Sequence, residues 1–154
     1  MKIQVPQEHL DSILELYKPE CRYLYDATLD FPKATGVFKL GDTYYTRERL
    51  AHMTSIEAQL CLNQLCYSAF GEWMSTKTLD HSIPFEEYLK KMKENMFIVD
   101  SRILFKMPID SSKVLIGSIE LMRLKKYDKI YLAILDYEFD DRKSKGQIKL
   151  ALRL

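Results

Sequence analysis

The sequence predicts an α+β fold in which an antiparallel sheet wraps around one long, buried helix. Residues 55–74 form the longest helical pattern and are apolar on nearly every side, which is typical of a buried helix. From about residue 95 onward, segments rich in β-branched and aromatic residues alternate with short turns, which is typical of antiparallel strands. A curved sheet around the helix is the economical way to pack these elements.

A short helix and two strands are expected before the long helix. Residues 7–17 repeat apolar side chains at helical spacing, and Pro19 ends this N-terminal helix. Residues 22–29 and 34–39 have the composition of strands, with Pro32 between them.

Capping signals place the start of the long helix at residue 55. Thr54 is a favourable N-cap residue, and Glu57 three residues later completes a capping box. The polar residues of the helix fall in two narrow stripes, which are Glu57 with Gln64 and Ser68, and Gln59 with Asn63.

Four strands and a short helix are expected after the long helix. The short helix is predicted over 86–94, and the strands over 95–107, 113–124, 128–139 and 146–153. Since the connections are short, consecutive strands are expected to pair as an antiparallel meander.

Composition and charge favour a soluble protein of the cytoplasm. The 154 residues, 1–154, have the length of one domain. With 23 basic and 22 acidic residues, nothing global favours nucleic acid or a membrane surface. We find no signal segment, and no apolar run reaches the roughly 18 residues of a membrane span. The three cysteines argue against a disulfide framework, and no Cys or His spacing predicts a metal site.

One string in the long helix resembles a known family. Leu60-Cys-Leu-Asn-Gln-Leu-Cys-Tyr-Ser-Ala-Phe70, with Cys21-Arg-Tyr-Leu-Tyr-Asp-Ala27 upstream, is similar to the FcoT-type thioesterase-like family of hot-dog proteins. The likeness covers about residues 10 to 152. The chain departs from the family pattern at Ala51 and Thr54, beside the start of the helix.

The resemblance implies a hot-dog fold whose tunnel at the helix binds fatty-acyl thioesters. Family members are described as acyl-CoA thioesterases or, in isonitrile lipopeptide-type pathways, as enzymes that add glycine to a (2E)-enoyl chain on an acyl carrier protein. We therefore expect glycine addition. Hydrolysis of a long-chain acyl-CoA is the alternative, and a non-catalytic acyl-binding module is the second alternative. No cofactor is expected beyond the phosphopantetheine or coenzyme A that carries the substrate, and a homodimer or higher homo-oligomer is implied.

Five residues are candidates for the site, and each also has a purely structural explanation. The resemblance implies that Tyr17, Tyr45 and Asn63 line the tunnel, although tyrosines are common in cores and a buried Asn often bonds only to backbone. His52 could be the general base or a loop residue on the surface. Glu57 could orient His52 or act as a base, but capping alone also explains it.

Helical geometry separates two of these candidates. Glu57 and Asn63 are six residues apart, so they point about 120° apart around the helix. They would share a pocket only if the pocket wraps the helix or a second subunit completes it.

Basic residues offer a further set of alternatives. Arg102 could contact a phosphopantetheine phosphate or pair on the surface. Two clusters could dock an acidic carrier protein or form solvated turns, namely Arg123, Lys125, Lys126 and Lys129, and Lys90, Lys91 and Lys93.

Overall fold

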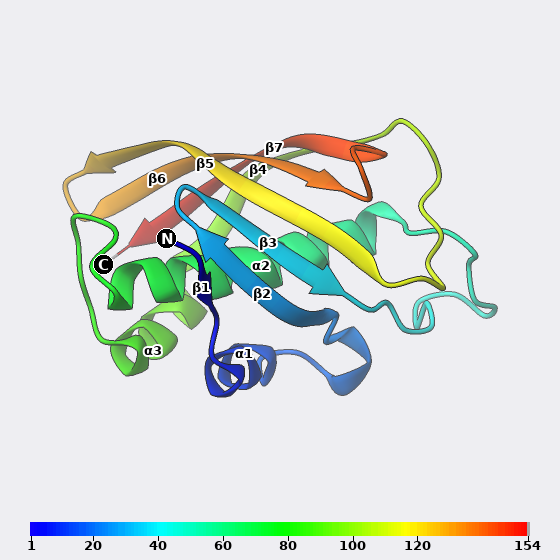
Figure 1. Cartoon of the computed structure of the whole chain (residues 1–154), viewed down its shortest axis with the longest axis horizontal. Helices are drawn as coiled ribbons and strands as arrows, with labels where there is room; N and C mark the ends of the chain where they lie inside the picture. Colours follow the sequence, from blue (N-terminus) through cyan, green and yellow to red (C-terminus); the bar gives the residue numbers. More distant parts are fainter. Residues whose placement is uncertain (154) are drawn as a thin grey trace.

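A seven-stranded antiparallel sheet packs one face against the long helix α2 (Ser55–Ser75) (Figure 1). The computed structural model describes residues 1–153. The remaining elements are β1 (Ile3–Gln4), α1 (Gln7–Leu14), the 3₁₀ helix η1 (Pro19–Cys21), β2 (Leu24–Asp30), β3 (Lys33–Phe38), α3 (Phe85–Asn95), β4 (Met96–Phe105), β5 (Leu115–Tyr127), β6 (Ile130–Phe139) and β7 (Ser144–Arg153). The predicted arrangement of a sheet on one buried helix is confirmed.

The predicted pairing of β4 with β5 is wrong. The strand order is β1-β2-β3-β5-β6-β7-β4, so β4 pairs with β7 and forms one edge of the sheet. β5 pairs with β3 and β6, and only β5, β6 and β7 form a meander. The connection over residues 106–114 is long enough to carry the chain from the edge of the sheet to its middle, so neighbours in sequence are not neighbours in the sheet.

The N-terminal helix is shorter than the sequence predicts. Instead of extending over 7–17, α1 ends at Leu14, and Tyr17 lies beyond it. Pro19 begins η1, and the residue before a proline is disfavoured in helical conformation, so Lys18 is extended with φ −57° and ψ 147°.

The predicted start of α2 is confirmed by both halves of the capping box. The Ile56 N–H donates to Thr54 Oγ1 at 3.3 Å, and the Thr54 N–H donates to Glu57 Oε2 at 3.2 Å. These bonds satisfy donors that would otherwise be unpaired in the first turn. The helix then runs buried beneath the sheet as far as Ser75.

One of the two polar stripes of α2 serves the fold. The buried Gln64 accepts the N–H groups of Tyr23 and Leu24, both at 2.9 Å, and donates to the Cys21 carbonyl at 2.6 Å. Ser68 donates to the Gln64 carbonyl at 2.9 Å. This stripe therefore ties the start of β2 to the helix and has no exposed polar atom to offer a ligand.

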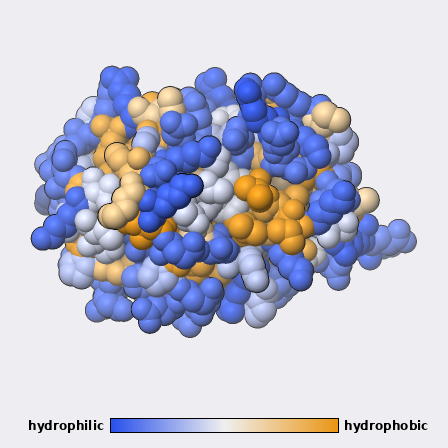
Figure 2. Space-filling model, in the orientation of Figure 1, coloured by the Kyte–Doolittle hydropathy of each residue, from blue (hydrophilic) through white to orange (hydrophobic). Residues whose placement is uncertain are grey.

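The cysteines of α2 are core residues, as expected. Cys61 and Cys66 are fully buried and free, and burial raises the pKa of both thiols. Figure 2 shows a largely hydrophilic face, interrupted by apolar patches. Among the described residues, none of the helices combines the length and the apolar character that crossing a bilayer requires.

Candidate active site

The second polar stripe of α2 faces the edge strand β4 across an open groove. Gln59, Asn63 and Tyr67 line a hollow of about 440 Å³ with residues 97–101 of β4. At the start of the helix, residues 52–55 line a second hollow of about 470 Å³ with residues 105–108. The residue numbers rise along α2 as they fall along β4, so the two hollows follow one another along this edge of the molecule.

A directed chain of hydrogen bonds fixes the amide of Asn63 in this groove. Ser101 Oγ donates to Gln59 Oε1 at 2.7 Å, and Gln59 Nε2 donates to Asn63 Oδ1 at 3.1 Å. The carbonyl oxygen of Asn63 is thus occupied, and its NH₂ group has no acceptor among residues 1–153. Asn63 therefore offers N–H donors to whatever binds in the groove.

Glu57 and Tyr45 form a separate unit at the start of α2. The Glu57 side chain is 2% exposed. Tyr45 Oη donates to Glu57 Oε2 at 2.5 Å and also bonds to Thr54 Oγ1. Burial, reinforced by the hydrogen bond to Glu57, raises the pKa of Tyr45 to about 12. Glu57 points away from the groove that holds Asn63, in agreement with the angular separation expected from the sequence.

His52 lies on the rim of the hollow at the helix start. Its backbone forms an antiparallel bridge with Asp110, supported by the Met53 N–H, which donates to the Ile109 carbonyl at 2.8 Å. The imidazole is exposed and lines the hollow. Among the described residues, Glu57 bonds to Thr54 and Tyr45 and not to His52. The expected orientation of His52 by Glu57 therefore does not occur within this chain.

Tyr17 lies beside the C-terminal half of α2, near Tyr67, whereas Tyr45 lies at the start of the helix. Tyr17 is half-buried against the core. Burial is the main cause that raises the pKa of Tyr17 above its usual range, and the nearby Tyr67 and Cys66 side chains raise it further. The structure thus places His52 and Asn63 in two successive hollows beside β4, Tyr17 near Tyr67, and Tyr45 with Glu57 at the helix start.

Two residues of the groove were not candidates from the sequence. Gln59 precedes Asn63 by four residues, and this spacing on a helix predicts neighbouring side chains. Ser101 bonds to Gln59 from the edge strand, and the sequence carries no signal for this contact because it depends on how β4 crosses the helix.

Comparisons with solved structures confirm the hot-dog fold. A protein of Syntrophus aciditrophicus, provisionally named a thioesterase, superposes with a TM-score of 0.58 at 14% identity, covering 94% of each chain. The HP0420 homologue of Helicobacter felis superposes with a TM-score of 0.55 at 11% identity, covering 96% of this chain and 89% of that chain.

Sequence comparison is more specific. The (2E)-enoyl-[ACP] glycyltransferase of Mycobacterium tuberculosis strain H37Rv is 28% identical, covering 97% of this chain and 87% of that protein. The enzyme of the same name from Mycobacterium marinum is also 28% identical, over 96% of this chain and 86% of its own length. The model of the FcoT-like thioesterase domain matches residues 12–152. The chain belongs to the family of FcoT-like thioesterase domains.

Proposed function

We propose that this protein is an acyl-thioester enzyme that adds glycine to a (2E)-enoyl chain held on an acyl carrier protein. Two observations support the proposal. The mycobacterial relatives that span nearly the whole chain are named for this reaction. The observation that carries it in the structure is the hydrogen-bond chain from Ser101 through Gln59, which leaves the Asn63 amide as a donor in an open groove.

The reaction needs a donor of this kind. The glycine nitrogen attacks C3 of the enoyl group and forms a C–N bond, while the electron pair of the double bond moves to the thioester oxygen. Preorganised N–H groups stabilise the negative charge of this enolate, and we assign this role to Asn63. The glycine nitrogen loses a proton and C2 gains one, so the addition is balanced without an oxidant or a reductant and leaves the thioester intact.

We assign the proton transfer to His52. Its imidazole is exposed at the hollow at the helix start, roughly 12 Å along α2 from Asn63 of the same chain, so the His52 that takes the proton from the glycine nitrogen would come from the second copy proposed below. Glu57 is buried and already accepts hydrogen bonds from Tyr45 and the Thr54 N–H, so its supported role is to hold the start of α2. Half-buried Tyr17 is assigned to the wall beside the acyl chain.

We further propose that a second copy of the chain closes the groove. β4 is an edge strand that exposes two apolar side chains beside the groove, with Phe97 54% and Val99 51% exposed. Exposed edges of this kind pair readily with another strand. Antiparallel pairing of β4 with its counterpart would cover the open side of the groove, and Val99→Lys would then yield a monomer in solution that has lost activity. A dimeric Val99→Lys variant, or an active monomer, would contradict this assembly.

Parallel incubations test the reaction. The protein is supplied with a (2E)-enoyl carrier protein with glycine, with the same carrier protein without glycine, and with a saturated long-chain acyl-CoA. The proposal predicts a glycine adduct in the first incubation alone, with the thioester unbroken. Release of free fatty acid without a glycine adduct would contradict the proposal and show that the protein hydrolyses the thioester.

Hydrolysis is the second candidate, because the family model is that of a thioesterase domain. The same Asn63 donors would then stabilise a tetrahedral oxyanion instead of an enolate. If no turnover occurs in any incubation but the acyl thioesters bind, the protein is instead a non-catalytic acyl-binding module.

A further inference from the structure

Three lysines project from one face of the sheet where β4 ends. Leu104 pairs with Lys145 on β7, and beyond it the Lys106 N–H donates to the Lys143 carbonyl at 2.7 Å. Residues two apart on a strand share a face of the sheet, so Lys106, Lys143 and Lys145 lie on the same face. This arrangement brings like charges together.

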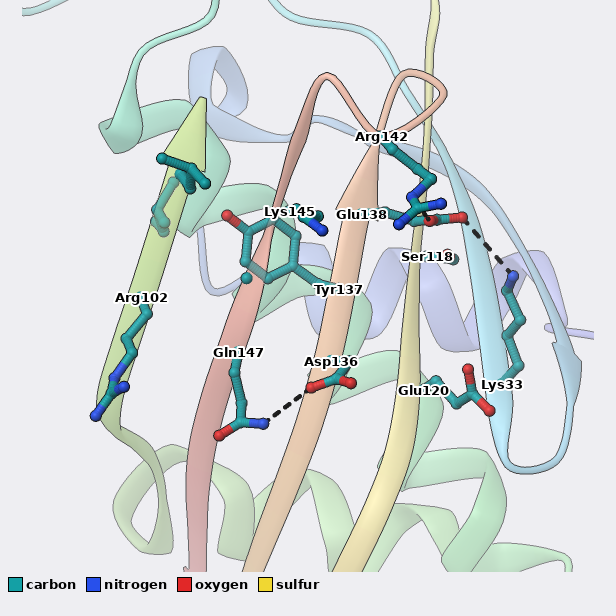
Figure 3. Close-up of a pocket in the computed structure, with 13 residues that line it drawn as sticks. Lys33, Arg102, Ser118, Glu120, Asp136, Tyr137, Glu138, Arg142, Lys145 and Gln147 are labelled. Atoms are coloured by element: carbon teal, nitrogen blue, oxygen red, sulfur yellow. Dashed lines mark hydrogen bonds and ion pairs between the residues drawn. The ribbon is translucent and has the colours of Figure 1, made fainter. Parts of the chain in front are cut away.

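Ion pairs neutralise the neighbouring cations but not Lys106 and Lys145. Lys143 Nζ lies 2.8 Å from Asp140 Oδ2, and Arg142 Nε lies 3.9 Å from Glu138 Oε2. Figure 3 shows Arg142 turned toward Glu138, with Lys145 outside that pair. Within residues 1–153, no carboxylate oxygen lies within 4.0 Å of either Lys106 or Lys145. The nearby Lys145 side chain, whose ammonium repels a second positive charge, lowers the pKa of Lys106.

Of this lysine pair, Lys106 borders the hollow at the start of α2, whereas Lys145 lines a separate hollow over the sheet. Lys106 lines the first of these hollows together with His52 and Ser55. The positive end of the α2 dipole also lies at this hollow and favours an anion. Asn63 lies roughly 12 Å further along the helix axis. An anionic group held at Lys106 would therefore stand at one end of the groove, with the proposed thioester contact deeper inside.

We propose that Lys106 and Lys145 bind the phosphate of the phosphopantetheine arm at the point where it enters the groove; this assignment rests on the proposed function. The phosphate neutralises the two uncompensated ammonium groups, and the arm then extends along α2 toward Asn63. Coenzyme A carries a phosphate at the same place on its arm, so the test must separate the two carriers.

The basic cluster on the hairpin between β5 and β6 is a suitable control. It holds Lys125 and Lys129, at the opposite end of the sheet from the turn between β6 and β7 (Figure 1). The double variant Lys125→Ala/Lys129→Ala removes the same charge as Lys106→Ala/Lys145→Ala. A general effect of net charge would appear in both variants.

The experiment compares one enoyl group on three carriers, namely the holo-carrier protein, coenzyme A, and pantetheine, which lacks the phosphate. We expect Lys106→Ala/Lys145→Ala to raise KM by about tenfold for the two phosphate-bearing substrates. The KM for the pantetheine thioester should not change, and the control variant should behave like wild type with the coenzyme A and pantetheine thioesters, which carry no protein to dock. The difference should shrink as salt is added, because exposed charges are screened.

Three results would overturn the proposal. An equal rise in KM for all three thioesters, or no rise, would show that the lysines do not bind the phosphate. A rise confined to the carrier protein would show that they contact its acidic surface instead. Dissociation constants for the same three thioesters, measured without glycine, give the same comparison even if glycine addition itself fails.

Discussion

Gln59 Nε2 donates a hydrogen bond of 3.1 Å to Asn63 Oδ1, and this bond decides which end of the Asn63 amide faces the groove. Reversing the Gln59 amide would set its carbonyl oxygen against Asn63 Oδ1 and lose this bond, while the present orientation also accepts from Ser101. The groove therefore contains a preorganised donor at the place where the family resemblance implies a thioester contact.

Removing this donor should affect turnover far more than folding. Asn63→Ala is expected to lower kcat by about 10²- to 10³-fold, the usual loss for one oxyanion-hole donor. The free energy of unfolding should change by less than about 1 kcal/mol, because the side chain is only half-buried. The matched control is Asn95→Ala at the end of α3, which should leave kcat unchanged. A variant at Asn63 with normal kcat would remove this residue from the mechanism.

Gln59 should act on the rate through Asn63 and not through substrate affinity. Gln59→Leu keeps the volume but removes the donor to Asn63 Oδ1, so kcat should fall about tenfold, equivalent to one hydrogen bond. KM should stay within a factor of about two, since substrate binding is not the step affected. A rise in KM at constant kcat would instead mean that Gln59 contacts the substrate directly.

Substitutions of His52 and of Glu57 should have very different effects on kcat. Glutamine can replace glutamate in a capping box, so Glu57→Gln should keep both the helix start and kcat within about threefold of wild type. His52→Gln should lower kcat by about 10²- to 10⁴-fold, as expected for a general base. Steady-state kinetics of the two variants test these assignments. If Glu57→Gln is inactive and His52→Gln is active, the general base is Glu57 and not His52.

The Tyr45–Glu57 hydrogen bond predicts a stability change at alkaline pH. Tyr45→Phe should cost about 1–2 kcal/mol at neutral pH, since it removes a bond to a buried carboxylate. The pKa of Tyr45 is raised from 10.0 to about 12, so its contribution is complete below pH 10 and is lost as the pH rises toward 12. Denaturant unfolding should therefore show the gap between wild type and Tyr45→Phe narrowing from pH 10 to 12. A difference in unfolding free energy that does not change with pH would contradict this expectation. The control is Tyr25→Phe, at a position that is 69% exposed.

The elements of the fold follow from local patterns, and the strand order does not. Thr54 and Glu57 mark the start of α2 because a capping box is a contact within one turn. The position of β4 beside β7 depends on the path of residues 106–114 and on packing across the whole sheet, which no local pattern records.

The candidate site divides in the same way. Helical periodicity separates Glu57 from Asn63, and the structure confirms that they face different surroundings. Periodicity does not distinguish Gln64 from Asn63, since both are amides on one helix. Only the structure shows that Gln64 forms hydrogen bonds with the backbone at the start of β2, while the Asn63 NH₂ group faces the groove. The contact from Ser101 also depends on tertiary packing. The assignment of Asn63 to a thioester contact comes from the family resemblance and remains a prediction.

The intact mass of the carrier protein tests the central claim most directly. A (2E)-enoyl carrier protein is incubated with glycine and with wild-type protein, Asn63→Ala or Asn95→Ala, and its mass is followed over time. Wild type and Asn95→Ala should add the mass of one glycine to the acylated carrier, while Asn63→Ala should do so at least about a hundredfold more slowly. Loss of the acyl group from the carrier, with no glycine adduct at any time, would contradict the account.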